Sequence, residues 1–210
     1  MNDQIQLTPE ELFVLGSLMR AKYIDYGYIA SMRDIQRNYT AVKAKCGQSL
    51  ARAGVLRQKL SGETVIRPAA AGLLRNIFFG RKESALDILF PNEEQAALGT
   101  RFHFGADSIT MVEINGRHLT VSAASPGDFE RVLHSAVGRH DQTPRLLSRI
   151  DMDFVTRTLI ARSIEIGTDT AMQTIFEQDG ALYSMNGDGH PELLTDAEAF
   201  ARLSRIMKGE

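Results

Sequence analysis

The same order of predicted elements occurs twice in the second half of the chain, and this recurrence constrains the fold most. In each copy, short alternating runs predict three strands, and a capped amphipathic segment predicts a helix after them. The first copy occupies residues 101–138 and the second residues 172–207, with the helix caps Ser125 and Thr195 70 residues apart. A near-constant offset indicates a duplicated unit. We therefore expect one antiparallel sheet with strands from both copies, related by approximate two-fold symmetry, with helices packed on a face.

Two turns and two further segments complete this half. Asn115-Gly116 and Asp179-Gly180 predict hairpin turns, the first of type I′, in which both residues have positive φ. Residues 81–99 are predicted as a connection with some helix, interrupted by Pro91. The segment 146–164 is predicted as a helix because its apolar residues recur at helical spacing, although its β-branched content weakens that prediction.

The first half begins with a strong helix signal. Thr8 is followed by Pro9, and Glu11 stands three residues after Thr8, which is a capping box with proline at the first helical position. A second helix is predicted over residues 26–37 and a third over residues 40–53. A hairpin and a further helix, opened by proline and closed by glycine, follow as far as residue 80. Helices followed by a hairpin and another helix are typical of a winged helix.

Charge is divided unevenly between these two sections. Residues 1–82 carry 13 Lys and Arg against 6 Asp and Glu, a net charge of +7, whereas residues 83–210 carry 11 against 20, a net charge of −9. This asymmetry fits nucleic-acid binding by the first section, and it equally fits attraction between two domains. The predicted fold class is α+β, with a winged-helix-like section over 1–82 packed with a duplicated antiparallel section over 83–210.

A candidate DNA-binding surface follows from the winged-helix interpretation. On the third helix, Lys45, Gln48 and Arg52 gather opposite the face predicted to be buried. If the helix enters a major groove, these three side chains would reach base edges. Arg57 and Lys59 on the hairpin would then contact phosphate. The alternative is that all five are solvated, because winged helices also serve as protein-binding modules.

A catalytic or metal-binding constellation is not visible in the sequence. None of the five histidines has a ligand partner at helical spacing, and the single cysteine excludes an internal disulfide and a cysteine-built zinc site. Nucleophile, phosphate-loop and dinucleotide motifs are missing as well. We expect no catalysis, cofactor or metal. Short apolar runs and the absence of a visible secretory signal lead us to expect a cytoplasmic protein without membrane insertion, and the oligomeric state stays open.

The layout resembles the EspG-like family of type VII secretion chaperones. Residues 7–15 (LTPEELFVL) look like the opening helix of that family, and residues 50–56, the hairpin and residues 66–68 look like its next section. The paired hairpins, each followed by a helix, resemble its quasi-symmetric body. The resemblance implies a non-enzymatic cytosolic chaperone or adaptor that holds the tip of helical-hairpin secretion substrates, without indicating contact residues. The alternative is a winged-helix transcriptional regulator with a C-terminal ligand or partner domain.

Overall fold

The computed structural model describes residues 4–24, 28, 35–91, 97–140, 146–165 and 170–209. The elements of the first part are β1 (Ile5–Leu7), α1 (Pro9–Leu18), α3 (Ile35–Arg52), β2 (Leu56–Gln58), β3 (Thr64–Ile66) and α4 (Pro68–Phe79). Strands and a helix follow as β4 (Lys82–Leu89), β5 (Ala97–Phe104), β6 (Ile109–Asn115), β7 (His118–Ala124) and α5 (Pro126–Val137). The last elements are the 3₁₀ turn Met152–Phe154, β8 (Val155–Glu165), β9 (Ala171–Gln178), β10 (Ala181–Met185), β11 (Pro191–Leu194) and α6 (Asp196–Lys208).

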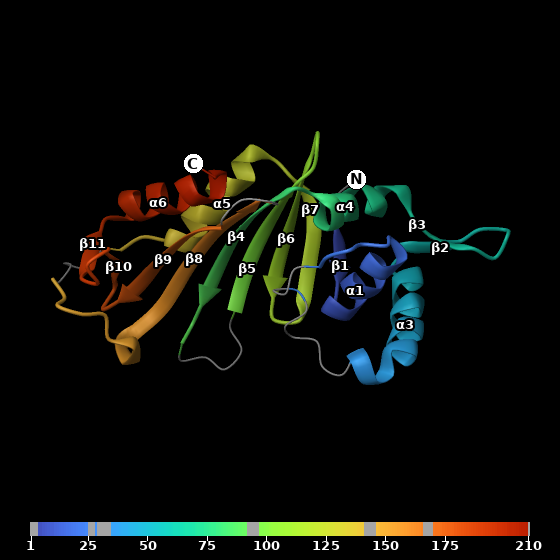
Figure 1. Ribbon diagram of the computed structural model, residues 1–210, viewed down its shortest axis with the longest axis horizontal. Coiled ribbons are helices and arrows are strands. Elements are labelled where there is room, and N and C mark those ends of the chain that lie inside the picture. Colours follow the sequence, from blue (N-terminus) through green and yellow to red (C-terminus); the bar gives the residue numbers. More distant parts are fainter. Residues whose placement is uncertain are drawn as a thin grey trace. The chain divides into compact units, whose positions relative to one another are not determined.

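Nine strands form one large antiparallel sheet in the order β1-β7-β6-β5-β4-β8-β9-β10-β11, and β2 pairs with β3 in a separate hairpin (Figure 1). The predicted mixture of helices with a large antiparallel sheet is therefore confirmed. Within the described part of the chain, no helix is both long enough and apolar enough to cross a membrane.

The chain divides into two compact units, each assembled from two segments. The first comprises Met1–Gly80 with His103–Ala123, and the second comprises Arg81–Phe102 with Ala124–Glu210. The predicted sections 1–82 and 83–210, and the winged-helix description of the first of them, stay predictions.

In the first unit, the predicted helix start is confirmed in detail. The Thr8 hydroxyl accepts from the Glu11 backbone N–H at 3.2 Å, and the Glu11 carboxylate accepts from the Thr8 N–H at 2.8 Å. These two bonds satisfy donors that the first helical turn leaves open. On α3, Cys46 and Leu50 are buried, and burial raises the pKa of the Cys46 thiol. The predicted second helix, residues 26–37, lies largely outside the described residues, although its last three residues begin α3.

In the second unit, α5 and α6 lie on the same face of the neighbouring strands (Figure 1). Both helices begin with a capping box, built by Ser125 with Asp128 and by Thr195 with Glu198. The Phe129 ring of α5 stacks on that of Phe102 with 3.9 Å between centroids. The apolar stripe of each helix is thus buried against the sheet, as its sequence spacing predicts.

Two segment predictions are wrong. Residues 81–99, predicted as a connection with some helix, contain the strand β4, and most of the predicted helix 146–164 is the strand β8. These strands pair with each other antiparallel, with Leu86 opposite Ala161, and both of those side chains are fully buried. Three consecutive residues of β4, 84–86, are all buried, so β4 lacks the alternation that marks a half-buried strand.

The first predicted hairpin turn is also wrong in its detail. Asp179 and Gly180 both have positive φ, at 52° and 73°, as a type I′ turn requires. In the other hairpin, β6 extends through Asn115, and the turn is made by Gly116, with φ of 56°, and Arg117. Glycine at the first central position is the pattern of a type II′ turn, so the turn begins one residue later than predicted.

Candidate functional site

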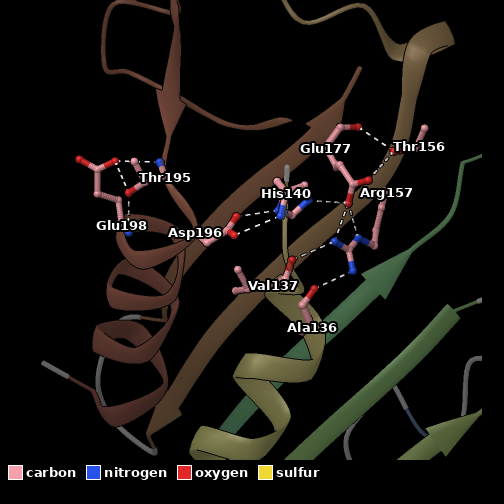
Figure 2. A network of polar contacts seen from close by, with 9 residues as sticks. All are labelled: Ala136, Val137, His140, Thr156, Arg157, Glu177, Thr195, Asp196 and Glu198. Atoms are coloured by element: carbon pink, nitrogen blue, oxygen red, sulfur yellow. Dashed lines mark hydrogen bonds and ion pairs between the residues drawn. The ribbon is translucent and has the colours of Figure 1, made fainter. Parts of the chain in front are cut away.

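A cleft of about 630 Å³ opens in the second unit. Its wall includes the residues that follow α5, the start of β8, the end of β9 and the glycine of the β9–β10 turn. The ionisable side chains in this wall are Arg139, His140, Arg157 and Glu177. Three of them, together with Asp196, form one polar network (Figure 2).

Arg157 lies at the centre of the network and uses all three guanidinium nitrogens. Its Nε donates to Glu177 at 2.7 Å, while Nη1 donates to the backbone oxygen of Ala136 at 2.6 Å and Nη2 to that of Val137 at 3.2 Å (Figure 2). Those oxygens belong to the last turn of α5, where carbonyls lack partners inside the helix. Arg157 therefore caps α5 with a positive charge at the negative end of the helix dipole.

His140 connects the chain after α5 to the start of α6. Its Nδ1 donates to Asp196 Oδ1 at 2.6 Å, its backbone N–H donates to the other oxygen of Asp196 at 3.1 Å, and its Nε2 lies 3.5 Å from Glu177. The histidine side chain is only 13% exposed. Two carboxylates thus hold the imidazole from opposite sides, and one of them also binds Arg157.

The polar side chains of this arrangement bind one another and the ends of neighbouring elements. The carboxylates of Glu177 and Asp196 are engaged by Arg157 and His140, so their charge is directed at neighbouring helix ends and strands. At the nearby start of α6, hydrogen bonds from the backbone N–H and hydroxyl of Thr195 hold the pKa of Glu198 below its usual value. Among the described residues, no group of three or more His, Cys, Asp and Glu side chains is arranged to hold a metal ion.

Sequence reasoning missed this network. Helical spacing reveals histidine partners only three or four positions away, whereas Asp196 lies 56 residues from His140. Arg157 and Glu177 lie in strands that pair with each other, and β8 was predicted as a helix. A correct assignment of β8 is the signal that would have placed these two side chains on neighbouring strands.

The five predicted DNA-binding residues lie in the first unit, and none of them lines the cleft. All of them are exposed: Lys45, Gln48 and Arg52 on α3, Arg57 on β2, and Lys59 after β2. The Lys59 ammonium forms an ion pair of 2.7 Å with Glu63 across the hairpin. The structure therefore brings the predicted residues to the surface of α3 and its hairpin, and contact with DNA stays a prediction.

The sequence matches no protein-family model and no curated protein. The fold, in contrast, is similar to that of a solved structure, the Mycobacterium tuberculosis type VII secretion system chaperone EspG5 in complex with the PE25–PPE41 dimer. The TM-score is 0.64, and the similarity covers 98% of this chain and 96% of the other at 7% sequence identity. Identity this low establishes similarity of fold alone. The predicted resemblance to EspG-like proteins is thus supported at the level of the fold.

Proposed function

We propose that this chain is a non-enzymatic cytosolic chaperone or adaptor that binds helical substrates of a type VII-like secretion system. One observation carries the proposal: nearly the whole chain shares its fold with nearly the whole of EspG5, a type VII secretion system chaperone in complex with the PE25–PPE41 dimer. Fold alone does not dictate function. Full-length coverage of both chains favours a role for the whole architecture rather than for one common motif.

The charged groups of the cleft are consistent with a binding protein. A general acid–base pair needs side chains directed at a substrate, whereas Arg157, Glu177 and His140 are directed at one another and at the ends of α5 and α6. Their arrangement supports stabilisation of the second unit. We therefore retain the expectation that the chain has no catalytic activity.

We also infer that the body is a duplication of a larger unit than the sequence predicts, with four strands and a helix in each copy. The strands β4 to β7 precede α5, and β8 to β11 precede α6. Corresponding elements begin 70 to 74 residues apart. The first strands of the two copies, β4 and β8, are neighbours in the sheet, and the remaining strands of each copy follow outward in chain order. This order supports approximate two-fold symmetry about the β4–β8 pair.

The proposed function is tested by co-expressing the chain with a PE–PPE-type helical dimer. We expect the proteins to co-elute in size-exclusion chromatography and the dimer to aggregate when expressed alone. An unrelated helical-hairpin protein of similar size is the control and should elute separately. Elution of the helical dimer separately from the chain would contradict the proposal.

The second candidate is a winged-helix DNA-binding regulator. The observation that favours it is the exposed basic surface of α3 and the hairpin, since the chain has no Asp or Glu from residue 35 to residue 62. A gel shift with the upstream region of the gene tests it. The regulator predicts sequence-selective retention, with affinity falling on a log–log salt plot by a slope of about 0.9 for each phosphate contact.

A further inference from the structure

The first unit carries an exposed surface whose composition the chaperone proposal does not explain. We call it the α3–hairpin surface and define it by Lys45, Gln48, Arg52, Arg57 and Leu60. All five side chains are exposed. No ion pair to Lys45, Arg52 or Arg57 is found among the residues that the structure describes. The positive charge of this surface is therefore available to a partner.

The two cations of α3 have a defined spacing. Lys45 and Arg52 are seven residues apart, which places them on one face of the helix, two turns and about 10.5 Å along its axis. The exposed residues between them are Gln48, Ser49 and Ala51. Side chains this short or uncharged would let another helix approach closely along this face. Two carboxylates two turns apart on that helix would match the cations.

The hairpin adds an apolar contact. Leu60 lies between β2 and β3 and is fully exposed. A single exposed leucine is ordinary, but this one lies three residues after Arg57 on a hairpin whose strand β2 contacts α3. Burial of a leucine side chain supplies binding free energy that exposed ion pairs alone lack.

We infer that the α3–hairpin surface docks an acidic amphipathic helix of a protein partner, with carboxylates seven residues apart against Lys45 and Arg52 and an apolar side chain against Leu60. This inference rests on the proposed function in taking the partner to be a helical secretion substrate. A protein fits the surface better than a nucleic acid for two reasons. A duplex rewards a high density of free cations, whereas Lys59 is already paired with Glu63, and the apolar Leu60 has no counterpart in a phosphate backbone.

The test uses the full chain and two fluorescent helical peptides of about 21 residues, or three heptads. One is alanine-rich with glutamate at every seventh position and a leucine row beside it, and the other has lysine in place of each glutamate. We expect the acidic peptide to bind and the lysine peptide not to bind. The double variant K45E/R52E should lose about tenfold or more in affinity for the acidic peptide and should gain binding to the lysine peptide.

The matched control is R75E/R149E, which changes the net charge equally at exposed sites outside the α3–hairpin surface. It should bind the acidic peptide within about twofold of the unaltered chain, apart from a small long-range effect that salt removes. Circular dichroism melting checks that both double variants fold. Equal losses in the two variants, or no binding of the acidic peptide, would overturn the inference.

A 20-base-pair duplex in the same assay identifies the other class of partner. Tighter binding of the duplex than of the acidic peptide, abolished by K45E/R52E, would make this a nucleic-acid surface and overturn the inference. The failure of the proposed function looks different. If the helical dimer co-elutes with K45E/R52E as well as with the unaltered chain, the docking surface is wrong while the chaperone role stands. If the acidic peptide binds as expected but no dimer is captured, the surface stands and the chaperone role fails.

Discussion

Charged residues are used in opposite ways in the two units. In the second unit, Arg157, Glu177 and His140 are mostly buried and are bound to one another and to helix ends. In the first unit, Lys45 and Arg52 lie exposed on α3, with no partner among the described residues. Half-buried charges must be paired to offset their desolvation, whereas exposed charges contribute little to folding and remain available for binding. The half-buried paired side chains of the second unit therefore serve stability, whereas the exposed cations of α3 are available for recognition.

The largest effect is expected at the centre of the cleft network. Arg157→Ala leaves the Glu177 carboxylate with only His140 and the Thr156 hydroxyl and uncaps two carbonyls of α5, so it should lower the free energy of unfolding by about 3 kcal/mol. The stability of Arg157→Lys should lie between those of Arg157→Ala and the unaltered chain, because an ammonium keeps the positive charge but cannot reproduce the guanidinium fork. Urea denaturation measures both variants. Arg149→Ala, at a side chain that is 83% exposed, is the control and should have almost no effect; similar losses at the two positions would break the comparison.

A helix cap provides the next effect. Thr195→Ala removes the hydroxyl that accepts from the Glu198 N–H at 3.2 Å, and loss of such a cap costs about 1 kcal/mol. Thr195→Ser keeps the hydroxyl and should restore most of the stability. Thermal unfolding measures the series, and an alanine variant as stable as the serine variant would contradict the assigned cap.

The carboxylates of the helix caps also determine how the stability of the chain falls at acid pH. Hydrogen bonds from the backbone N–H and hydroxyl of Ser125 hold the pKa of Asp128 below its usual value. A carboxyl with a lowered folded-state pKa contributes stability above its unfolded pKa, near 4, and this contribution disappears as pH falls through the folded-state value. Asp128→Asn should therefore be less stable than the unaltered chain at pH 7, with the difference shrinking toward pH 2. Urea midpoints across that range test the sign, and a constant difference would contradict it.

The smallest effect on stability should come from the first unit. Removing both cations of α3 in K45A/R52A should change the free energy of unfolding by no more than about 0.5 kcal/mol, because both side chains are exposed. The same variant should weaken binding of the acidic peptide. A large loss of stability would mean that these cations serve folding, which would remove the contrast between the units.

Local signals were predicted well from the sequence. The capping box at Thr8 and the helix caps Ser125 and Thr195 are confirmed because each depends on residues only a few positions apart. The hairpin signal at Asp179-Gly180 succeeds for the same reason.

Features that depend on distant segments were not predicted. The strands β4 and β8 were missed because they pair with each other, a partnership between distant segments that local periodicity does not reveal. The network of His140 was missed because Asp196 and Glu177 reach it through the tertiary fold. The exposed cations of α3 were identified from helical spacing alone, but their partner depends on another molecule.

The most direct test of the chaperone role is isothermal titration calorimetry of the purified chain with a PE–PPE-type helical dimer. We predict saturable binding at a fixed stoichiometry, with a negative heat-capacity change from buried apolar surface, and weaker binding by K45E/R52E than by R75E/R149E. No heat of binding to the dimer, together with tight and sequence-selective binding of the upstream DNA, would contradict the account.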